Sequence, residues 1–587
     1  MISRLRSSRR ARLALLQVAL ILSVGLTANL VHRQTLLLPK TEAAPRRTPV
    51  QEFAAVSASG QVSPAANAGA AVQAPAGPGA KLIDDTRFFY AANFYAGQIQ
   101  KFLDSQPGPL KTFHETLGGR DESFADLLSS RTILYSLNPQ VVQALIEQQS
   151  GLITHPDASP ERMDWALNYH GESEKWKGLM AQVRWATREL YRGQRDYPAL
   201  PELTYTNASH SPVPTGLNVG GYAIARVLAA TTTPDDLPAK LDGGAGSFVA
   251  TYTRLFDDPR NAAPVLHQPS APFLSLPLDR MYTISAFFDH DAPFLQTNGS
   301  IVTYRGDQST TLAYDGHTGW DYAAKPPAPV LAAASGTVVF AGNADDNCGA
   351  KAVIIDHGNG YRTLYWHLSE VLAKPGPVAR GDKIGIVGSS GCATGPHLHF
   401  QVEFLGRDTD PYGWCGPTGK DPWVHHPSGV LNIWLWSYMP SPCHLPADAV
   451  VAPGDLSWHK RGAGWETVAG GAGGLAMRVV SVPADQLDTP VAEWLSELKQ
   501  TGRYHVMAWI PFIENQTPDS TAAHYVIHYA GAANTVTIDQ SAAVNTWADL
   551  GTYQFDSNQH PYVELPAVDA QPGTNIWFDA MVWLPVK

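Results

Sequence analysis

The stretch GPHLHF, residues 395–400, places two histidines one residue apart, each followed by an apolar residue. Successive side chains of a β-strand point to opposite faces. If this stretch is a strand, His397 and His399 share one face, and the apolar residues that follow them point the other way, into a core. Two imidazoles on one face are typical of a metal site or a proton relay. The chain has 20 histidines, so chance pairing is the alternative, and only further partners can decide between the two.

Candidate partners lie upstream, in the same β-rich part of the chain. The stretch HTGWD (317–321) supplies His317 and Asp321, and YWHL (365–368) supplies His367. A catalytic zinc ion takes three protein ligands and leaves one position open. Imidazole and carboxylate groups are suitable ligands for it. The residue types therefore favour a zinc site made by His317, Asp321 and one histidine of the pair, which leaves the other histidine of the pair, with His367, for proton transfer.

These stretches, followed by GSSGCATGPHLHF (388–400), resemble in kind and order the lysostaphin-type (LytM) zinc metalloendopeptidases, which cut bacterial peptidoglycan. The resemblance covers about residues 310–405. It implies Zn²⁺ as the cofactor, with three protein ligands: His317, Asp321 and His399. It also implies two catalytic histidines: His367 and His397.

The function implied by this resemblance is hydrolysis of peptide bonds in bacterial peptidoglycan. The sequence has no Glu base of the His-Glu-x-x-His kind, so one histidine must orient or deprotonate the attacking water while the other stabilises the oxyanion. The sequence leaves open which histidine does which. Some relatives have lost metal ligands and only activate other enzymes. The alternative is therefore a non-catalytic wall-binding scaffold or activator of other cell-wall hydrolases, which the complete set of five residues disfavours.

The length of the chain, 587 residues, is too great for one hydrophobic core and predicts two to four domains. Its 44% hydrophobic and 16% charged residues are ordinary for a globular protein. The net charge of -11 argues against nucleic acid as a partner.

The first 33 residues differ from the rest. Five arginines precede an apolar run at residues 13–31, which is typical of an export signal. The run is also long enough to span a bilayer, and no clean small-x-small cleavage site follows it. Residues 1–33 are therefore a signal peptide or an uncleaved signal anchor that contacts the membrane. The remainder would be extracytoplasmic, either membrane-anchored or secreted to the cell wall. Residues 34–80 are rich in Ala and Pro and predict a disordered linker.

The remaining chain divides by its hydrophobic periodicity. Helical spacing dominates residues 81–265, and short β-rich runs between turn residues dominate residues 280–430 and 450–587. We therefore expect a multidomain α+β protein with a helical N-terminal domain, an antiparallel β metallopeptidase domain and a C-terminal β-sandwich. The C-terminal part resembles the sandwich domain of golvesin and xanthan lyase, through stretches such as GRYHVMAWIP (502–511). That resemblance implies binding of polysaccharide.

The helical part contains YSLNPQVVQALIEQQSGL (135–152), which resembles the first catalytic helix of lysozyme-like lytic transglycosylases. Gln149 occupies the position of the catalytic Glu, and an amide has no proton to donate to a glycosidic oxygen. Glu147 is no substitute, because two residues along a helix correspond to a rotation of about 200°. The resemblance implies a domain that binds glycan without cutting it, and the alternative is an unrelated helical domain.

Four cysteines lie within one region of about 100 residues. Outside the cytoplasm, an even number of clustered cysteines indicates disulfides. Sequence alone allows three pairings, of which we predict Cys348 with Cys392 and Cys415 with Cys443.

Two other histidine motifs are assigned structural roles. His357 lies beside an Asn-Gly hairpin turn. The stretch FFDHD (287–291) looks like a metal motif, but its apolar pair is typical of a strand end.

Overall fold

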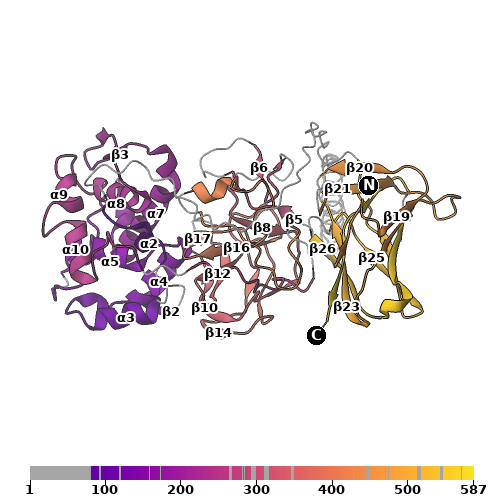
Figure 1. Cartoon of the computed structure of the whole chain (residues 1–587). Helices are drawn as coiled ribbons and strands as arrows, with labels where there is room; N and C mark the ends of the chain where they lie inside the picture. Colours follow the sequence, from indigo (N-terminus) through magenta and orange to yellow (C-terminus); the bar gives the residue numbers. More distant parts are fainter. Residues whose placement is uncertain are drawn as a thin grey trace, which may run out of the picture. The chain divides into compact units, whose positions relative to one another are not determined.

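A computed structural model provides the structure of the protein. It describes residues 81–586 except 91–93, 118–119, 158, 172–173, 264–266, 281, 283, 292–298, 310–315, 345–348, 427–428, 444–448, 470, 473–474, 512–516, 543–545 and 570–571. The predicted signal or anchor (1–33) and linker (34–80) lie outside the described residues. Helices and antiparallel sheets are combined, as expected for a multidomain α+β protein (Figure 1). A search of the described residues finds no helix with the length and apolar character needed to cross a bilayer.

The helical region extends from residue 81 to residue 263 and is coloured indigo to magenta in Figure 1. Its α-helices are α2 Asp85–Phe88, α3 Ala96–Asp104, α4 Phe124–Leu134, α5 Pro139–Ser150, α6 Pro160–Asp164, α7 Leu179–Asp196, α8 Val219–Ala229, α9 Leu237–Asp242 and α10 Phe248–Leu255. The sequence did not predict its two short hairpins, β1 His114–Leu117 with β2 Arg120–Ser123, and β3 Leu203–Thr204 with β4 His210–Ser211. These strands have four residues or fewer, too short for a periodicity to register.

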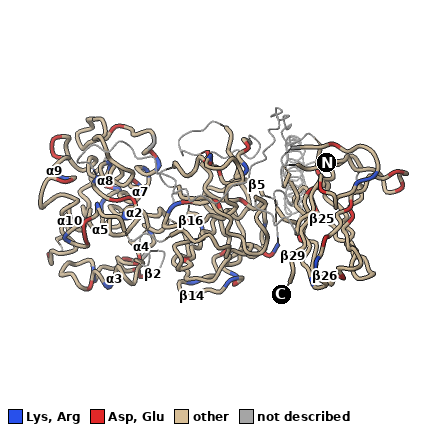
Figure 2. Tube along the Cα trace, in the orientation of Figure 1, with Lys and Arg blue, Asp and Glu red and all other residues tan. Residues whose placement is uncertain are grey.

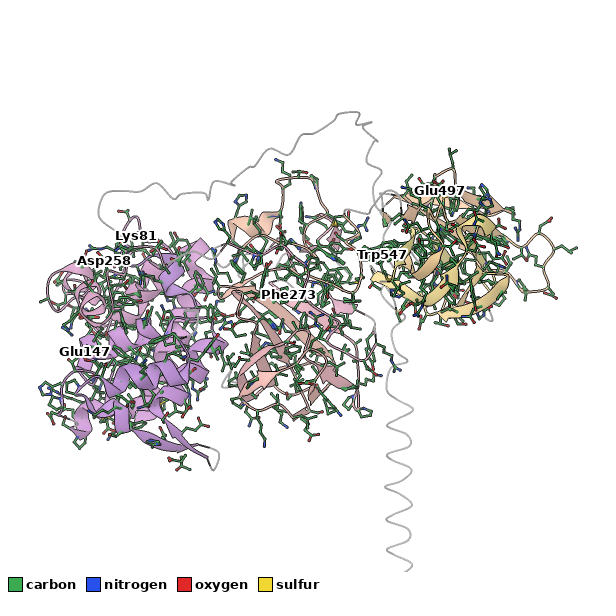
Figure 3. The ribbon with its side chains drawn as sticks, turned by 60° about the horizontal axis from the view of Figure 1, so that its bottom comes forward. Lys81, Glu147, Asp258, Phe273, Glu497 and Trp547 are labelled. Atoms are coloured by element: carbon green, nitrogen blue, oxygen red, sulfur yellow. A yellow bond between two sulfur atoms is a disulfide. The ribbon has the colours of Figure 1, made fainter. Side chains whose placement is uncertain are left out.

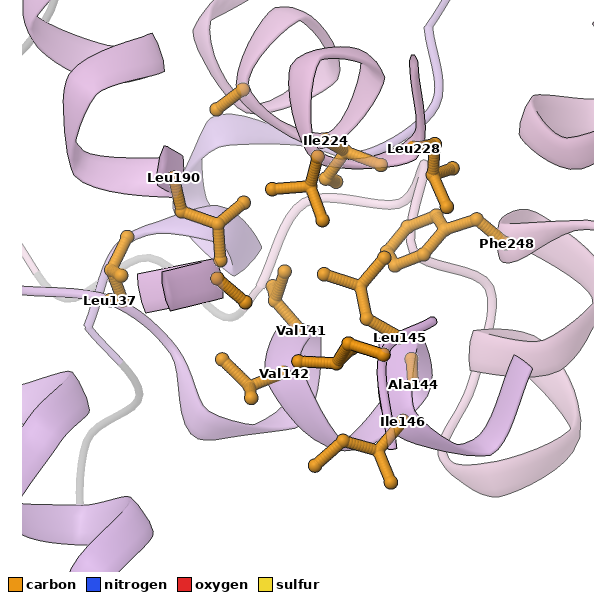
Figure 4. Packing of buried hydrophobic residues seen from close by; sticks show 14 of the residues in the cluster. Leu137, Val141, Val142, Ala144, Leu145, Ile146, Leu190, Ile224, Leu228 and Phe248 are labelled. Atoms are coloured by element: carbon orange, nitrogen blue, oxygen red, sulfur yellow. The ribbon is translucent and has the colours of Figure 1, made fainter. Parts of the chain in front are cut away.

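Helix α5 shows why this region folds as it does. The Asn138 side chain caps its first turn and Pro139 occupies the first helical position, as the Asn-Pro pair predicts. Gly151 ends the helix with a φ of 68°, a left-handed conformation that glycine adopts without strain. Between these ends, Val141 and Leu145 are four residues apart and fully buried. Figure 4 shows apolar side chains of α5, α7, α8 and α10 meeting in one core.

The central region is built on an antiparallel sheet with the order β14–β10–β11–β12–β16–β8–β5, in which β17 also pairs with β16. These strands are β5 Ile284–Ala286, β8 Gly319–Tyr322, β10 Gly336–Asn343, β11 Lys351–Asp356, β12 Tyr361–Trp366, β14 Gly376–Val378, β16 Leu398–Phe404 and β17 Arg407–Asp408. A second sheet has the order β13–β15–β9, made by β13 Glu370–Val371, β15 Lys383–Ile386 and β9 Pro329–Leu331. A hairpin joins β6 Ile301–Val302 and β7 Gln308–Ser309.

The side chains of strand β16 alternate between the two faces of the central sheet. Leu398 and Phe400 are fully buried in the aromatic core, which confirms the expected inward direction of the apolar residues of GPHLHF. His399 and the alternate residues after it lie on the opposite face. On that face His399 pairs with Asp321 of β8 on one side and with Trp366 of β12 on the other.

The helical region contacts this same face of the sheet. Ile133 of α4 packs in one apolar cluster with Ile354 of β11 and Leu364 of β12. Beside the cluster lies a polar group that we call the Arg362 network, defined by three residues: Ser136, Arg362 and Glu403. Arg362 donates to Glu403 through Nε (3.1 Å) and to Ser136 Oγ (3.0 Å), and Ser136 Oγ donates to Glu403 (2.6 Å). The Arg362 guanidinium also lies 4.3 Å from the ring centre of Tyr90.

The C-terminal region, from residue 449 onward, consists of strands in three sheets. Their orders are β18–β29–β23–β26, β19–β22–β27–β24–β25 and β20–β21–β28. The strands are β18 Val450–Val451, β19 Trp458–Arg461, β20 Glu466–Ala469, β21 Leu475–Val480, β22 Val491–Leu495, β23 Gly502–Ile510, β24 Ala523–Tyr529, β25 Ala532–Ile538, β26 Thr546–Phe555, β27 Tyr562–Pro566, β28 Asn575–Phe578 and β29 Met581–Pro585. Side chains from all three sheets share one apolar core. Trp547, labelled in Figure 3, donates through Nε1 to the carbonyl of Pro440 at 3.0 Å.

The remaining observations concern the cysteines and the distribution of charged residues. Cys415 and Cys443 form a disulfide with a Cα–Cα distance of 5.0 Å, which confirms that pairing. Cys392 is also disulfide-bonded, and its predicted partner Cys348 lies outside the described residues. Figure 2 shows Lys and Arg interspersed with Asp and Glu along the described trace.

Candidate metal centre and active site

Three residues of the central region bring their ligand atoms to one point. Strands β8 and β16 place Asp321 opposite His399, and the loop before β8 supplies His317. His317 Nε2 lies 2.9 Å from His399 Nδ1 and 3.2 Å from Asp321 Oδ1, and the third distance, His399 Nδ1 to Asp321 Oδ1, is 3.0 Å. Ligand atoms bound tetrahedrally at about 2.0–2.1 Å lie about 3.3 Å apart. The group therefore fits one tetrahedral ion with a fourth position left open.

The surroundings of these residues suit a cation. Burial opposes the charge of Asp321, but His317 and His399 outweigh it and hold the pKa of this carboxyl well below its usual range. Burial lowers the pKa of His399, which favours the neutral imidazole that a metal requires. Two imidazoles facing a carboxylate offer the nitrogen and oxygen donors that zinc binds.

The orientation of His317 is fixed by the segment before it. His317 Nδ1 lies 2.7 Å from the carbonyl oxygen of Phe287, which can only accept a hydrogen bond. Nδ1 must therefore carry the proton, and Nε2 is left bare toward Asp321 and His399. The Phe287 ring stacks on Trp320 at 4.8 Å. The backbone of the FFDHD segment thus orients His317, and its first ring packs against Trp320.

His367 and His397 lie beside the three candidate ligand residues. Their ring centres are 4.7 Å apart, and His367 is 6.2 Å from the ring of His399. His367 Nδ1 donates to the Ser390 carbonyl and His397 Nδ1 to the Gly395 carbonyl, both at 2.8 Å. Each ring therefore has a bare Nε2 that can accept a proton or, once protonated, donate a hydrogen bond.

His367 directly follows β12 in an unusual backbone conformation. Its φ is 64°, in the left-handed region that non-glycine residues rarely adopt. Such strain is concentrated at functional sites. Burial lowers the pKa of His367, so its imidazole is neutral at pH 7 and can act as a base. His397 Nε2 lies 3.7 Å from Asp321 Oδ2, which places it at the edge of the ligand group.

All five residues predicted from the sequence are therefore close together, and the two histidines given structural roles are apart from them. His357 Nδ1 donates to the Ser335 carbonyl (3.0 Å), and His357 Nε2 lies 2.9 Å from Thr363 Oγ1. His290 is buried between Asp410 and Asp421, 2.9 Å from each.

Sequence reasoning missed the residues that orient the site. The Ser390 and Phe287 carbonyls and the Gln401 side chain hold three of the histidines. Every residue type has a main-chain carbonyl, so the sequence cannot indicate which carbonyls orient the histidines. Gln401 could have been found from the sequence, because it follows His399 at a spacing of two and so lies on the same face of the strand.

Comparison with known families divides the chain as its periodicity does. Residues 81–270 match the family model of the LasA N-terminal domain, residues 315–411 that of peptidase family M23, and residues 455–582 that of the golvesin C-terminal domain. The central region thus carries a peptidase family M23 domain, which confirms the LytM-type resemblance, and the golvesin resemblance is confirmed as well. For the helical region, the LasA N-terminal domain replaces the lysozyme-like resemblance drawn from residues 135–152.

Curated relatives match mainly through the central region. The DD-carboxypeptidase/endopeptidase Mpg of Neisseria meningitidis is 44% identical over 102 residues, 17% of this chain and 23% of the relative. The peptidoglycan DD-endopeptidase ShyA of Vibrio cholerae is 42% identical over 92 residues, 16% of this chain and 21% of the relative. The chain therefore spans less than a quarter of the length of either. The protease LasA of Pseudomonas aeruginosa is 25% identical over 351 residues, 55% of this chain and 74% of the relative.

Proposed function

We propose that this protein is a zinc-dependent metalloendopeptidase that hydrolyses peptide bonds of bacterial peptidoglycan. The observation that carries the proposal is the convergence of His317, Asp321 and His399 on one point, with two further imidazoles presenting bare Nε2 atoms beside it. The named relatives Mpg and ShyA support endopeptidase chemistry on peptidoglycan.

In this proposal His317 Nε2, His399 Nδ1 and a carboxylate oxygen of Asp321 would hold a zinc ion. When bound, zinc supplies Lewis acidity and makes a water molecule more acidic. His367 and His397 divide the proton chemistry, since one Nε2 takes the proton of the attacking water and the other donates a hydrogen bond to the oxygen that becomes negative. The carbonyls of Ser390 and Gly395 keep the proton on Nδ1 of both rings. The ring that acts as base is therefore the neutral imidazole with a bare Nε2, and the ring that donates must be an imidazolium with a proton on Nε2 as well.

The test uses the full-length protein and purified peptidoglycan. Mass spectrometry of the released fragments should show newly cleaved peptide bonds. His399→Ala should lose both zinc and activity, whereas His397→Ala should keep zinc and still be inactive. Retention of zinc by both variants would show that the roles of the two histidines are divided wrongly. A parent protein that binds zinc and the wall but releases no fragment would instead indicate a non-catalytic scaffold or activator.

We also propose the domain boundaries and roles of the flanking regions: a signal peptide or anchor at 1–33, a linker at 34–80, a helical domain at 81–265, a metallopeptidase domain at 280–430 and a β-sandwich at 450–587. The protein would act outside the cytoplasm, anchored or secreted at the cell wall. The C-terminal region would add binding of polysaccharide.

For the helical region we propose that Glu147 has a structural role and that the region does not cleave glycan. The Glu147 carboxylate (Figure 3) is buried and accepts from the backbone N–H groups of Ile153 and Thr154, each at 3.1 Å, and from Arg254 at 3.0 Å. These bonds support a structural role, because they hold the chain that follows α5. Gln149 Nε2 lies 3.4 Å from Thr231 Oγ1. Sugar reducing ends released by a full-length His397→Ala protein, and abolished by Glu147→Gln, would contradict this proposal.

A further inference from the structure

The side chain of Gln401 connects the metal centre to a buried carboxyl group. His399 and Gln401 alternate with apolar residues on β16, so they lie on the same face of the strand. His399 turns Nδ1 toward His317 and Asp321 and presents Nε2 to Gln401 Oε1 at 3.4 Å, at the long end of hydrogen-bond distances. The other end of the same amide, Nε2, donates to Asp408.

The orientation of this amide follows from its two neighbours. Asp408 lies on β17 beside β16 and is only 8% exposed. Either protonation state of Asp408 leaves an oxygen that can accept the Gln401 N–H. With Asp408 ionised, the opposite orientation would place two acceptor oxygens against each other. With Asp408 protonated, it would aim the amide N–H at His399 Nε2 and leave the ring proton on Nδ1, the atom that faces His317 and Asp321. Gln401 therefore presents its oxygen to His399, and a ring nitrogen that meets an oxygen must carry the proton.

A second, independent contact encloses the same edge of the His399 ring. Gly319 pairs with Gln401 across β8 and β16. A Cβ at position 319 would lie 2.8 Å from His399 Nε2 and 2.8 Å from Cε1, closer than real Cβ atoms come. Glycine thus allows the backbone of β8 to lie against this ring edge. Leu364, which pairs with Gln401 on the other side and is 2% exposed, contributes no polar group. The amide oxygen is the polar partner that the described contacts give to His399 Nε2.

We propose that Gln401 is a positioning residue for the proposed metal ligand His399. Its amide oxygen accepts a hydrogen bond from His399 Nε2–H, which leaves Nδ1 without a proton and directed at the metal. The proposal rests on the zinc centre proposed above. A ligand histidine whose outer nitrogen meets an acceptor keeps the correct tautomer and ring direction, and loss of such an acceptor typically weakens metal binding about 10–100-fold.

The experiment compares substitutions at position 401 in the full-length protein. Gln401→Leu fills similar space but has no acceptor, and Gln401→Met repeats the test with an unbranched side chain. Gln401→Glu keeps an oxygen in reach of His399. Gln554→Leu, at an exposed glutamine of β26, is the matched control. Two readouts are used besides activity: the zinc dissociation constant by competition with a chromophoric chelator, and the visible spectrum of the Co²⁺-loaded protein.

Gln401→Leu and Gln401→Met should weaken zinc binding about 10–100-fold and change the cobalt spectrum, because the ring is free to turn or to exchange tautomers. Gln401→Glu should bind zinc within about threefold of the parent, as should the control. Unchanged affinity and spectrum in both apolar variants would overturn the inference, and so would a Gln401→Glu variant as weak as Gln401→Leu. If the parent itself bound no zinc, the proposed metal centre would fail and this inference with it. If the parent bound zinc without cutting peptidoglycan, only the proposed function would fail.

Discussion

Replacing Arg362 by methionine removes the cationic half of the Arg362 network and leaves Glu403 buried with Ser136 as its remaining donor in that network. Arg362 is 1% exposed and Glu403 is 3% exposed, so water cannot compensate for the loss. Breaking a buried ion pair by removing one partner costs about 3–5 kcal/mol. For regions of this size, about 1 kcal/mol lowers Tm by about 2–4 °C. We therefore expect Arg362→Met to lower Tm by roughly 6–20 °C.

The assay is calorimetry of the full-length protein, with Arg503→Met as the control, because Arg503 is exposed on β23. The control should change Tm little. A double variant, Arg362→Met with Glu403→Met, removes both charges and should recover most of the loss, since replacing a whole buried pair by apolar groups is often neutral. A drop of about 2 °C or less for Arg362→Met, or a double variant as unstable as the single one, would refute the reasoning.

Three further predictions concern pH, metal and the disulfide. Burial opposes the charge of His290, but its bonds to Asp410 and Asp421 raise its pKa to about 9. Because the unfolded pKa is about 6.5, this stabilisation should be complete below about pH 6.5 and be lost as pH rises through about 9. Melting curves should show a steeper decline over that window in the parent than in His290→Gln. A chelator should abolish release of peptidoglycan fragments and added Zn²⁺ should restore it, whereas activity that persists in the metal-free protein would contradict a metal mechanism. Cys443→Ser opens the bridge to Cys415, which closes a separation of 28 residues, and should cost about 3–4 kcal/mol in denaturant unfolding; no measurable change would count against a stabilising role.

Features that depend on local pattern could be predicted from the sequence. The alternation of GPHLHF places Phe400 in the core and His399 on the opposite face, as observed. The Asn138-Pro139 pair marks the start of α5. The three motifs of the central region identify residues that the structure brings together. In the first two cases the period of a strand or the chemistry of a cap acts over a few neighbouring residues. The residues of the central region were instead identified by the resemblance of their motifs to a known family.

Apart from the Cys415–Cys443 pair and the residues of the central motifs, features that depend on distant pairing could not be predicted. Asp408 reaches Gln401 because the chain reverses at Leu405 and Gly406, both with positive φ. The residue types in this turn do not specify which residues of β16 and β17 lie opposite each other. His290 meets Asp410 from 120 residues away, and no periodicity specifies which acid a histidine will meet. The sequence therefore singled out side chains that the structure brings together, but not the groups that hold them in place.

The position of the Arg362 network also constrains how the sequence of this protein can change during evolution. Domains that recombine freely between proteins meet at surfaces that function with any neighbour or with water. Here the helical region supplies Ser136 and Tyr90 to a charged pair that the central region buries. If another helical region without Ser136 and Tyr90 took its place, Arg362 and Glu403 would stay buried but lose the hydrogen bonds and the ring contact that these residues provide. We therefore expect the helical and central regions to be inherited as a unit, with compensating substitutions at these positions, rather than exchanged as separate modules.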